Sequence, residues 1–139
     1  MSVNKVILLG NVGREPDVRY IDQQTVVAKF PLATDERWRK AGEEGKTQER
    51  TEWHRLVAWN DMARRVEKAV HKGAKLYIEG HLRTRSYEDK AHILRYETEI
   101  MIDRMEVVTF PNGTPNAVVA EAMGGNDNFT ELTEATDNG

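Results

Sequence analysis

Alternation between apolar and polar residues constrains the fold of this chain more than any other feature. Residues two apart in a β-strand share a face, so alternation predicts a strand that is buried on one side only. The run Thr25–Thr34 follows this pattern, with Val26, Phe30 and Leu32 on one face. The last apolar segment slips out of alternation near Arg104, which predicts a bulge. Strands are expected at five places: Val3–Val12, Thr25–Thr34, Arg50–Trp59, Ala74–Leu82 and Ile93–Val108.

One segment between the third and fourth strands has the pattern of a helix, Asp61–Lys72. Asn60 or Asp61 can cap its first turn, and Gly73 can end its last. A barrel of five strands with a helix between strands three and four is an OB-fold. The sequence therefore predicts an all-β, five-stranded OB-fold barrel with one α-helix. The apolar stripe of that helix comprises Met62, Val66, Ala69 and Val70.

The chain divides into a basic body and an acidic tail. All 20 lysines and arginines lie in residues 1–110, whereas residues 111–139 hold no base and five of the 23 acids. The net charge of −3 hides this division. The tail has too little apolar area to offset the entropy of ordering it. We predict an OB-fold domain over residues 1–110 and an acidic, mostly disordered tail over residues 111–139, in which Ala117–Met123 could form a short helix.

Several classes of function lack the residues that they need. The chain has no cysteine, which excludes a disulfide framework, a cysteine zinc site and a thiol nucleophile. Its four histidines form no close pair, and we predict neither a metal nor another cofactor. The apolar runs are too short to cross a membrane, and the N-terminus lacks the order of a signal peptide. The sequence thus predicts a soluble cytoplasmic protein with no membrane partner.

An enzymatic function finds support in one loop only. The segment Gly42–Thr47 resembles a phosphate-binding loop, which needs four residues between its glycines and a helix after its lysine. Here only Glu43 and Glu44 separate the glycines, and a strand is expected to follow. We therefore predict no enzymatic activity. The rival hypothesis, a phosphate-handling protein built on this loop, requires nucleotide binding that depends on Lys46.

Aromatic residues lie close to basic residues in the body of the chain: Trp38 beside Arg37 and Arg39, Trp53 and Trp59 on either side of Arg55, and Tyr87 after Arg83 and Arg85. Bases of a single strand stack on flat aromatic rings, and nearby cations neutralise phosphates. Duplex DNA hides the faces of its bases from such rings. The alternative is that each tryptophan belongs to the core. Trp53 and Trp59 lie opposite the more apolar face of their strand, which favours a single-strand nucleic-acid-binding domain.

Six motifs follow one another, evenly spaced, over about residues 3–108: Val3-Asn4-Lys5-Val6-Ile7-Leu8, Gly10-Asn11-Val12-Gly13, Pro16-Asp17-Val18-Arg19-Tyr20, Thr51-Glu52-Trp53-His54-Arg55, Tyr77-Ile78-Glu79-Gly80 and Leu82-Arg83-Thr84-Arg85. Together they resemble the bacterial single-stranded DNA-binding protein family. The resemblance implies an OB-fold that assembles as a homotetramer. It also implies a nucleoid-associated protein that wraps single-stranded DNA during replication, recombination and repair.

The resemblance also implies roles for individual residues. The family's base-stacking positions are occupied by Trp38, Trp53, Trp59 and Tyr87. Its DNA-backbone-contacting positions are occupied by Lys5, Arg19, Arg55, Lys72, Arg83 and Arg85. His54 resembles a histidine at the family's subunit contact, and Tyr77 falls on the strand that joins subunit pairs. The family often has Phe at the position of Trp59 and Trp at that of Tyr87, and some relatives carry Lys near Asp61.

The tail departs from the family pattern. Many members end in acids followed by a Pro-Phe tip that docks partner proteins, whereas this sequence ends in Thr136-Asp137-Asn138-Gly139. Either the sequence is clipped or this member lacks the tip, so docking of replication and repair proteins through such a tip is not assigned. A second hypothesis stays open, an OB-fold primosome or recombination accessory protein that acts mainly through protein contacts. A third is an RNA-binding OB protein, which the resemblance alone disfavours.

Overall fold

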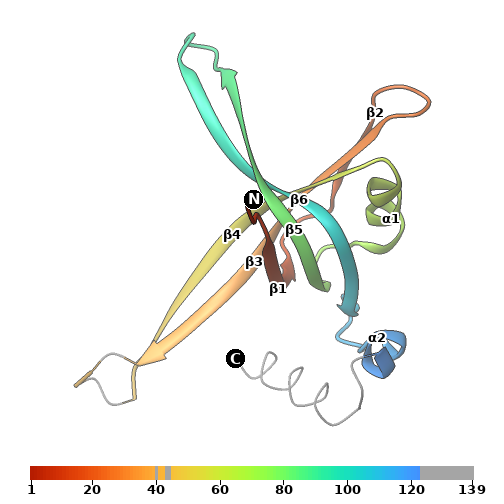
Figure 1. Cartoon of the computed structure of the whole chain (residues 1–139). Coiled ribbons are helices and arrows are strands. Elements are labelled where there is room, and N and C mark those ends of the chain that lie inside the picture. Colours follow the sequence, from red (N-terminus) through yellow and green to blue (C-terminus); the bar gives the residue numbers. More distant parts are fainter. Residues whose placement is uncertain (40, 43–44, 123–139) are drawn as a thin grey trace.

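The fold is a closed β-barrel with two long hairpins and one covering helix (Figure 1). The computed structural model describes residues 1–39, 41–42 and 45–122. Its strands are β1 (Val6–Val12), β2 (Asp17–Tyr20), β3 (Val26–Arg39), β4 (Thr47–Trp59), β5 (Lys75–Glu88) and β6 (Leu94–Thr109). Its helices are α1 (Asp61–Ala69) and α2 (Ala117–Ala122).

Five of these strands close the barrel in the order β1-β5-β6-β4-β3, with β3 pairing back to β1. The pairings are antiparallel except for a short parallel seam, in which Leu56 faces Ile100 and Val57 faces Met101. With α1 between β4 and β5, this arrangement confirms the predicted OB-fold barrel and the place of its helix. A sixth strand, β2, pairs with β3 and was not predicted, because four largely exposed residues carry no recognisable alternation.

The barrel interior holds the main core, which includes Leu32, Leu56, Leu76 and Ile78, all fully buried. These residues come from the apolar faces of the predicted strands, so that part of the alternation was interpreted correctly. The strands β3, β4 and β5 are nevertheless longer than predicted at their hairpin ends, and β1 begins at Val6 rather than Val3. The extra length of β3, β4 and β5 is exposed on both faces, so it shows no apolar periodicity and the pattern could not reveal it.

The helix α1 covers the barrel with Ala63 and Val66. The predicted stripe is correct at Val66 and Val70, and Met62 packs partly buried against the same core. It is wrong at Ala69, which is exposed; Ala63 takes its place. The helix ends three residues early, so Gly73 does not end it. Asn60 stands at the N-cap without a side-chain cap, because its Oδ1 accepts the Val26 N–H at 3.2 Å instead.

A bulge lies in the pairing of β5 with β6, as the slip near Arg104 predicted. Glu79 faces Arg104 while Gly80 faces Ile102, so one residue of β6 has no partner. A Cβ added at Gly80 would lie 2.2 Å from the carbonyl oxygen of Met101, a separation that no side chain can occupy. Glycine therefore lets the two strands cross closely at this point.

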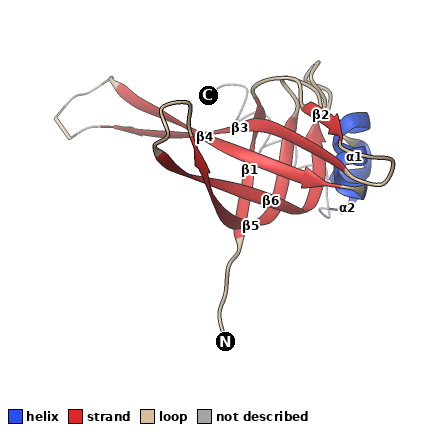
Figure 2. Cartoon of the chain, turned by 90° about the horizontal axis from the view of Figure 1, so that it is seen from above, coloured by secondary structure: helices blue, strands red, loops and turns tan. Residues whose placement is uncertain are grey.

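Both hairpins extend outward from the barrel, in different directions (Figure 1). The β3–β4 hairpin stays paired out to Arg39 and Thr47, and the β5–β6 hairpin out to Glu88 and Leu94. Seen from above, the helices lie on the side of the molecule away from the tip of the β3–β4 hairpin (Figure 2). The barrel and its helix thus form a base from which the two hairpins project.

The short helix expected after the body is present as α2. Its Val119 and Ala120 are buried against Val108, with Tyr77 packed beside them. The described structure therefore continues past residue 110 as far as Ala122, at the place where the sequence allowed a short helix. The rest of the predicted acidic tail lies outside the described residues. Among the described residues, no helix is long and apolar enough to cross a membrane.

Candidate nucleic-acid interface

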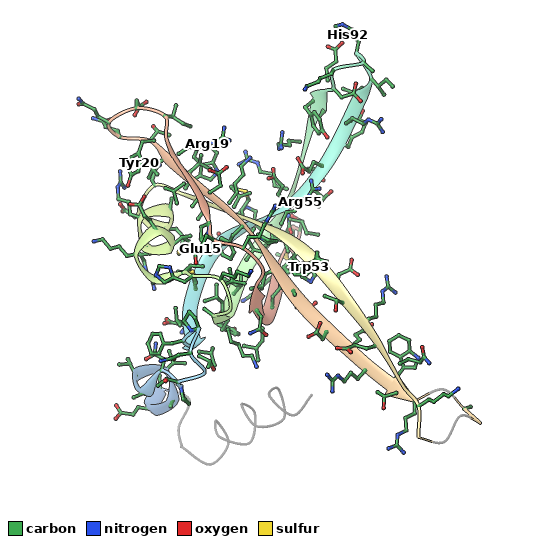
Figure 3. All side chains as sticks on the ribbon, turned by 180° about the vertical axis from the view of Figure 1, so that it is seen from behind. Glu15, Arg19, Tyr20, Trp53, Arg55 and His92 are labelled. Atoms are coloured by element: carbon green, nitrogen blue, oxygen red, sulfur yellow. The ribbon has the colours of Figure 1, made fainter. Side chains whose placement is uncertain are left out.

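A run of four adjoining hollows crosses the strands of the barrel, and we call it the groove. Their volumes are about 450, 330, 330 and 420 Å³. Neighbouring hollows share lining residues: Trp53 and Arg55 join the first two, Arg55 and Glu97 the next, and Asp17 and Lys29 the last. Figure 3 shows Arg19, Arg55 and Trp53 in this order across the strands. The groove is therefore a continuous, open surface rather than an enclosed pocket.

Trp53 lies at one end of the groove with 59% of its surface exposed. Its ring packs on the backbone of Gly13, where an added Cβ would lie 2.4 Å from the ring atom Cζ3. The Gly13 N–H donates to the Pro31 carbonyl at 3.0 Å, which ties this backbone to β3. A glycine at this position thus makes room for a large ring that is supported by the protein and still open to solvent.

The other predicted stacking residues are exposed as well. Trp59 lines the far end of the groove beside Arg19. Trp38 lies apart, in a hollow of about 500 Å³ on the β3–β4 hairpin, and Tyr87 lies on the β5–β6 hairpin. All four rings keep at least 41% of their surface exposed, which excludes the alternative that the tryptophans belong to the core.

Four cations line the centre of the groove, and three of them come from different strands: Lys29 from β3, Arg55 from β4 and Arg85 from β5. Two carboxylates of β6, those of Glu97 and Glu99, form ion pairs with these three cations. Glu97 pairs with both arginines, while Glu99 accepts the Arg85 Nε–H at 2.8 Å and lies 3.8 Å from the Lys29 ammonium. The guanidinium carbon of Arg85 also lies 5.3 Å from the centre of the Tyr87 ring, a cation–π distance.

The predicted backbone-contacting cations are not all in the groove. Arg19 lines it and pairs with Asp17 at 3.3 Å, and Arg83 is exposed on β5. Lys5 and Lys72 lie outside the groove. The Lys5 ammonium is 3.3 Å from Glu79, and the backbone N–H of Lys72 donates to Glu15 at 2.8 Å.

The two residues predicted at subunit contacts have internal partners. His54 Nε2 lies 2.8 Å from the Thr34 hydroxyl, in a partly buried position beside the groove. The Tyr77 hydroxyl donates to Glu79 at 2.9 Å, which raises the pKa of Tyr77 and lowers that of Glu79. Asp61 pairs with Arg64 at 2.9 Å on α1.

Several groove residues escaped the sequence analysis: Arg14, Lys29, Tyr96, Glu97 and Glu99. Lys29 carried a signal, because it is a charged residue in the middle of an otherwise apolar strand. Glu97 and Glu99 carried a weaker one, as acids two apart on the last strand. Nothing local in the sequence shows that these acids meet cations from three other strands.

The alternative sites find no support in the described residues. Residues 1–39, 41–42 and 45–122 contain no group of three His, Asp or Glu side chains placed to hold a metal ion. The strand β4 begins at Thr47, directly after Lys46, so the helix that a phosphate loop requires is absent there. Glu43 and Glu44 of that loop lie outside the described residues.

Comparison with known proteins agrees with this geometry. The model of the "Single-strand binding protein family" matches residues 3–108. The chain is 54% identical over 113 residues to a single-stranded DNA-binding protein of Bacteroides thetaiotaomicron, covering 81% of this chain and 70% of the relative. It is also similar to the structure titled "Plasmodium falciparum SSB complex with ssDNA", with a TM-score of 0.67 and 32% identity over 76% of this chain and 93% of that one. The exposed rings, the cationic groove and these matches together show that the chain belongs to the single-strand binding protein family.

Proposed function

We propose that this protein binds single-stranded DNA without strong sequence preference, by stacking bases on exposed rings and neutralising phosphates with the cations of the groove. One observation supports this most directly. The ring of Trp53 packs on Gly13 and is open to solvent on its other side, and Arg55 lines the same hollow. A flat ring beside a cation matches the alternation of base and phosphate along a single strand.

The chemistry of the groove also explains the expected lack of sequence preference. Every base has a π face, so stacking contributes about 1–3 kcal/mol per base whatever the sequence. Duplex DNA offers only base edges and backbone to such a surface. Trp38, Trp53, Trp59 and Tyr87 are the proposed stacking residues, and all four are exposed.

The proposed phosphate contacts fall into two groups. Arg55 and Arg85 lie at the centre of the groove, and Arg19 lies near its end, so their positions support direct contact. Arg83, Lys5 and Lys72 are proposed from the family pattern alone. A strand long enough to reach the last two would have to leave the groove and continue around the barrel.

Assembly and biological role are part of the same proposal. We infer a homotetramer that protects single-stranded DNA in replication, recombination and repair, with His54 and Tyr77 at subunit contacts. Exposed apolar side chains on β1, Ile7 and Leu9, support burial of that strand in an assembly. The proposed division into a DNA-binding domain over residues 1–110 and an acidic tail over residues 111–139 follows charge. We place the protein with the nucleoid in the cytoplasm, where a bacterium exposes its single strands.

Tryptophan fluorescence during titration with oligo(dT), with native mass recorded on the same sample, tests this proposal. We expect strong quenching by a tetramer, and affinity that falls with salt at a log–log slope of about −0.7 per phosphate neutralised. Absence of quenching would contradict the stacking mechanism and favour a protein that acts mainly through protein contacts. A parallel titration with oligo(U) tests the RNA-binding alternative, which predicts tighter binding to the ribose strand.

A further inference from the structure

The cations of the groove form ion pairs with acidic side chains that are less exposed than the cations are. The side chains of Arg55 and Arg85 are 65% and 47% exposed, whereas those of Glu97 and Glu99 are 16% and 10% exposed. The carboxylates therefore lie deeper than the guanidinium groups that they contact. A ligand that approaches the groove meets the cations first, with a counter-charge already in place behind them.

The two carboxylates are not equivalent. Glu97 uses one oxygen for Arg55 on β4 and the other for Arg85 on β5, so it bridges both arginines of the groove. Glu99 is nearly buried and joins Arg85 to the more distant Lys29. Three cations thus share two negative charges, and of the two carboxylates it is Glu97 that pairs with both arginines proposed to meet phosphate.

A phosphate and a carboxylate can accept hydrogen bonds from the same donor groups. Both accept charge-assisted hydrogen bonds from guanidinium N–H groups, in similar planar arrangements. The donors that Arg55 and Arg85 give to Glu97 are unavailable to DNA while those pairs persist. The side chains of Arg55 and Arg85 are 65% and 47% exposed, so an incoming phosphate can reach their guanidinium groups and take the place of the carboxylate.

From this geometry we propose that Glu97 is an internal competitor for the phosphates of single-stranded DNA. The strand gains Arg55 and Arg85 in exchange for their ion pairs with Glu97, which weakens binding and limits the number of phosphates neutralised. Glu99 positions Arg85 and is not the group proposed to exchange, because its ion pairs are with Arg85 and Lys29 rather than with both arginines. This inference rests on the proposed binding of single-stranded DNA and adds a residue that sets its strength.

The substitution Glu97→Gln removes the charge and keeps the size of the side chain. We expect it to tighten binding of oligo(dT) about fivefold at low salt. This factor corresponds to the free energy of interaction between two unit charges about 4 Å apart in water. The log–log salt slope should become steeper by about 0.7, which corresponds to one further phosphate neutralised. Glu121→Gln is the matched control, because it makes the same change in net charge at an exposed position on α2, outside the groove.

A double-mutant cycle separates competition from a general change in charge. If Glu97 acts through Arg55, then Arg55→Gln costs more affinity in the Glu97→Gln background than in the original protein. Thermal melting of each variant checks that it is folded. Should Glu97→Gln prove unstable, Glu97→Asp keeps the charge but is too short to bridge both arginines, and we expect a smaller tightening from it.

The outcomes are distinct. Equal effects of Glu97→Gln and Glu121→Gln, or an additive cycle, would overturn the competitor role. Weaker binding by Glu97→Gln would also overturn it and make Glu97 a residue that positions the arginines for DNA. Failure of the unsubstituted protein to bind oligo(dT) would instead contradict the proposed function itself.

Discussion

The two long hairpins differ in what they bring to the groove. The β3–β4 hairpin carries the three tryptophans, and its outer cross-strand pairs are exposed, such as Arg37 with Glu49 at 3.5 Å. The β5–β6 hairpin carries Tyr87 together with the carboxylates Glu97 and Glu99. The three tryptophans and the two carboxylates therefore come from different hairpins, and Tyr87 is the one proposed stacking residue on the hairpin of the carboxylates. Neither hairpin alone contains the proposed site.

The largest expected effect comes from breaking the seam that fixes one hairpin against the other. Leu56 is fully buried and faces Ile100 across the parallel pairing of β4 and β6. Leu56→Ala should lower the free energy of unfolding by about 2–5 kcal/mol, since it opens a cavity in the core. Urea denaturation measures this. Leu94→Ala, at an exposed position on β6, is the control and should change stability by no more than about 0.5 kcal/mol.

A smaller effect, on binding rather than folding, sharpens the comparison between the two hairpins. Trp53→Ala should weaken binding of labelled oligo(dT) by about 1–3 kcal/mol, while Tyr87→Ala should lie at the lower end of that range because its ring is smaller. Fluorescence anisotropy gives both values. Tyr87→Phe keeps the ring and should bind like the original protein. A drop in melting temperature with unchanged affinity in Trp53→Ala would show that Trp53 supports the fold instead.

The smallest expected effect concerns the tip of the β5–β6 hairpin. Asp89 accepts the backbone N–H groups of Ile93 and Ala91 and pairs with Arg95, and these contacts lower its pKa. A depressed pKa means that Asp89 stabilises the turn above the ordinary pKa of aspartate, and that this support is lost as the pH falls through the lower, folded value.

Nuclear magnetic resonance can follow this titration. The amide shifts of Ala91 and Ile93 should change together, with a midpoint below the ordinary aspartate pKa of about 3.9. Asp89→Asn should abolish the transition. A midpoint at or above the ordinary value would contradict the hydrogen bonding of this turn.

The sequence predicted the barrel well because a strand or helix with one buried face has apolar residues at regular spacing. The core faces of β3 and β4, the helix between β4 and β5 and the bulge near Arg104 all follow from local pattern. The outer halves of the hairpins show no such periodic pattern, because both of their faces are exposed. The strand β2 was missed for the same reason.

The proposed site was predictable only in part. Trp38, Trp53 and Tyr87 were found because each lies within two residues of a basic residue, and Trp59 because it shares a strand face with Arg55; the exposure of all four rings agrees with a binding role. The network of Glu97 with Arg55 and Arg85 was not, because it joins residues on three different strands. Contacts of that kind depend on how the hairpins cross, which no local pattern encodes. The same limit applies to Gly13, whose role is visible only once Trp53 lies over it.

The parallel seam also bears on how the chain reaches this structure. Each hairpin pairs segments that are neighbours in sequence, whereas the seam joins Leu56 to Ile100 across the whole of α1 and β5. Closing so long a loop costs entropy before any contact compensates it, and such non-local pairing slows folding. We expect closure of the barrel, rather than formation of either hairpin, to limit the rate. Stopped-flow refolding of Leu56→Ala should then show slower folding with a smaller change in the unfolding rate.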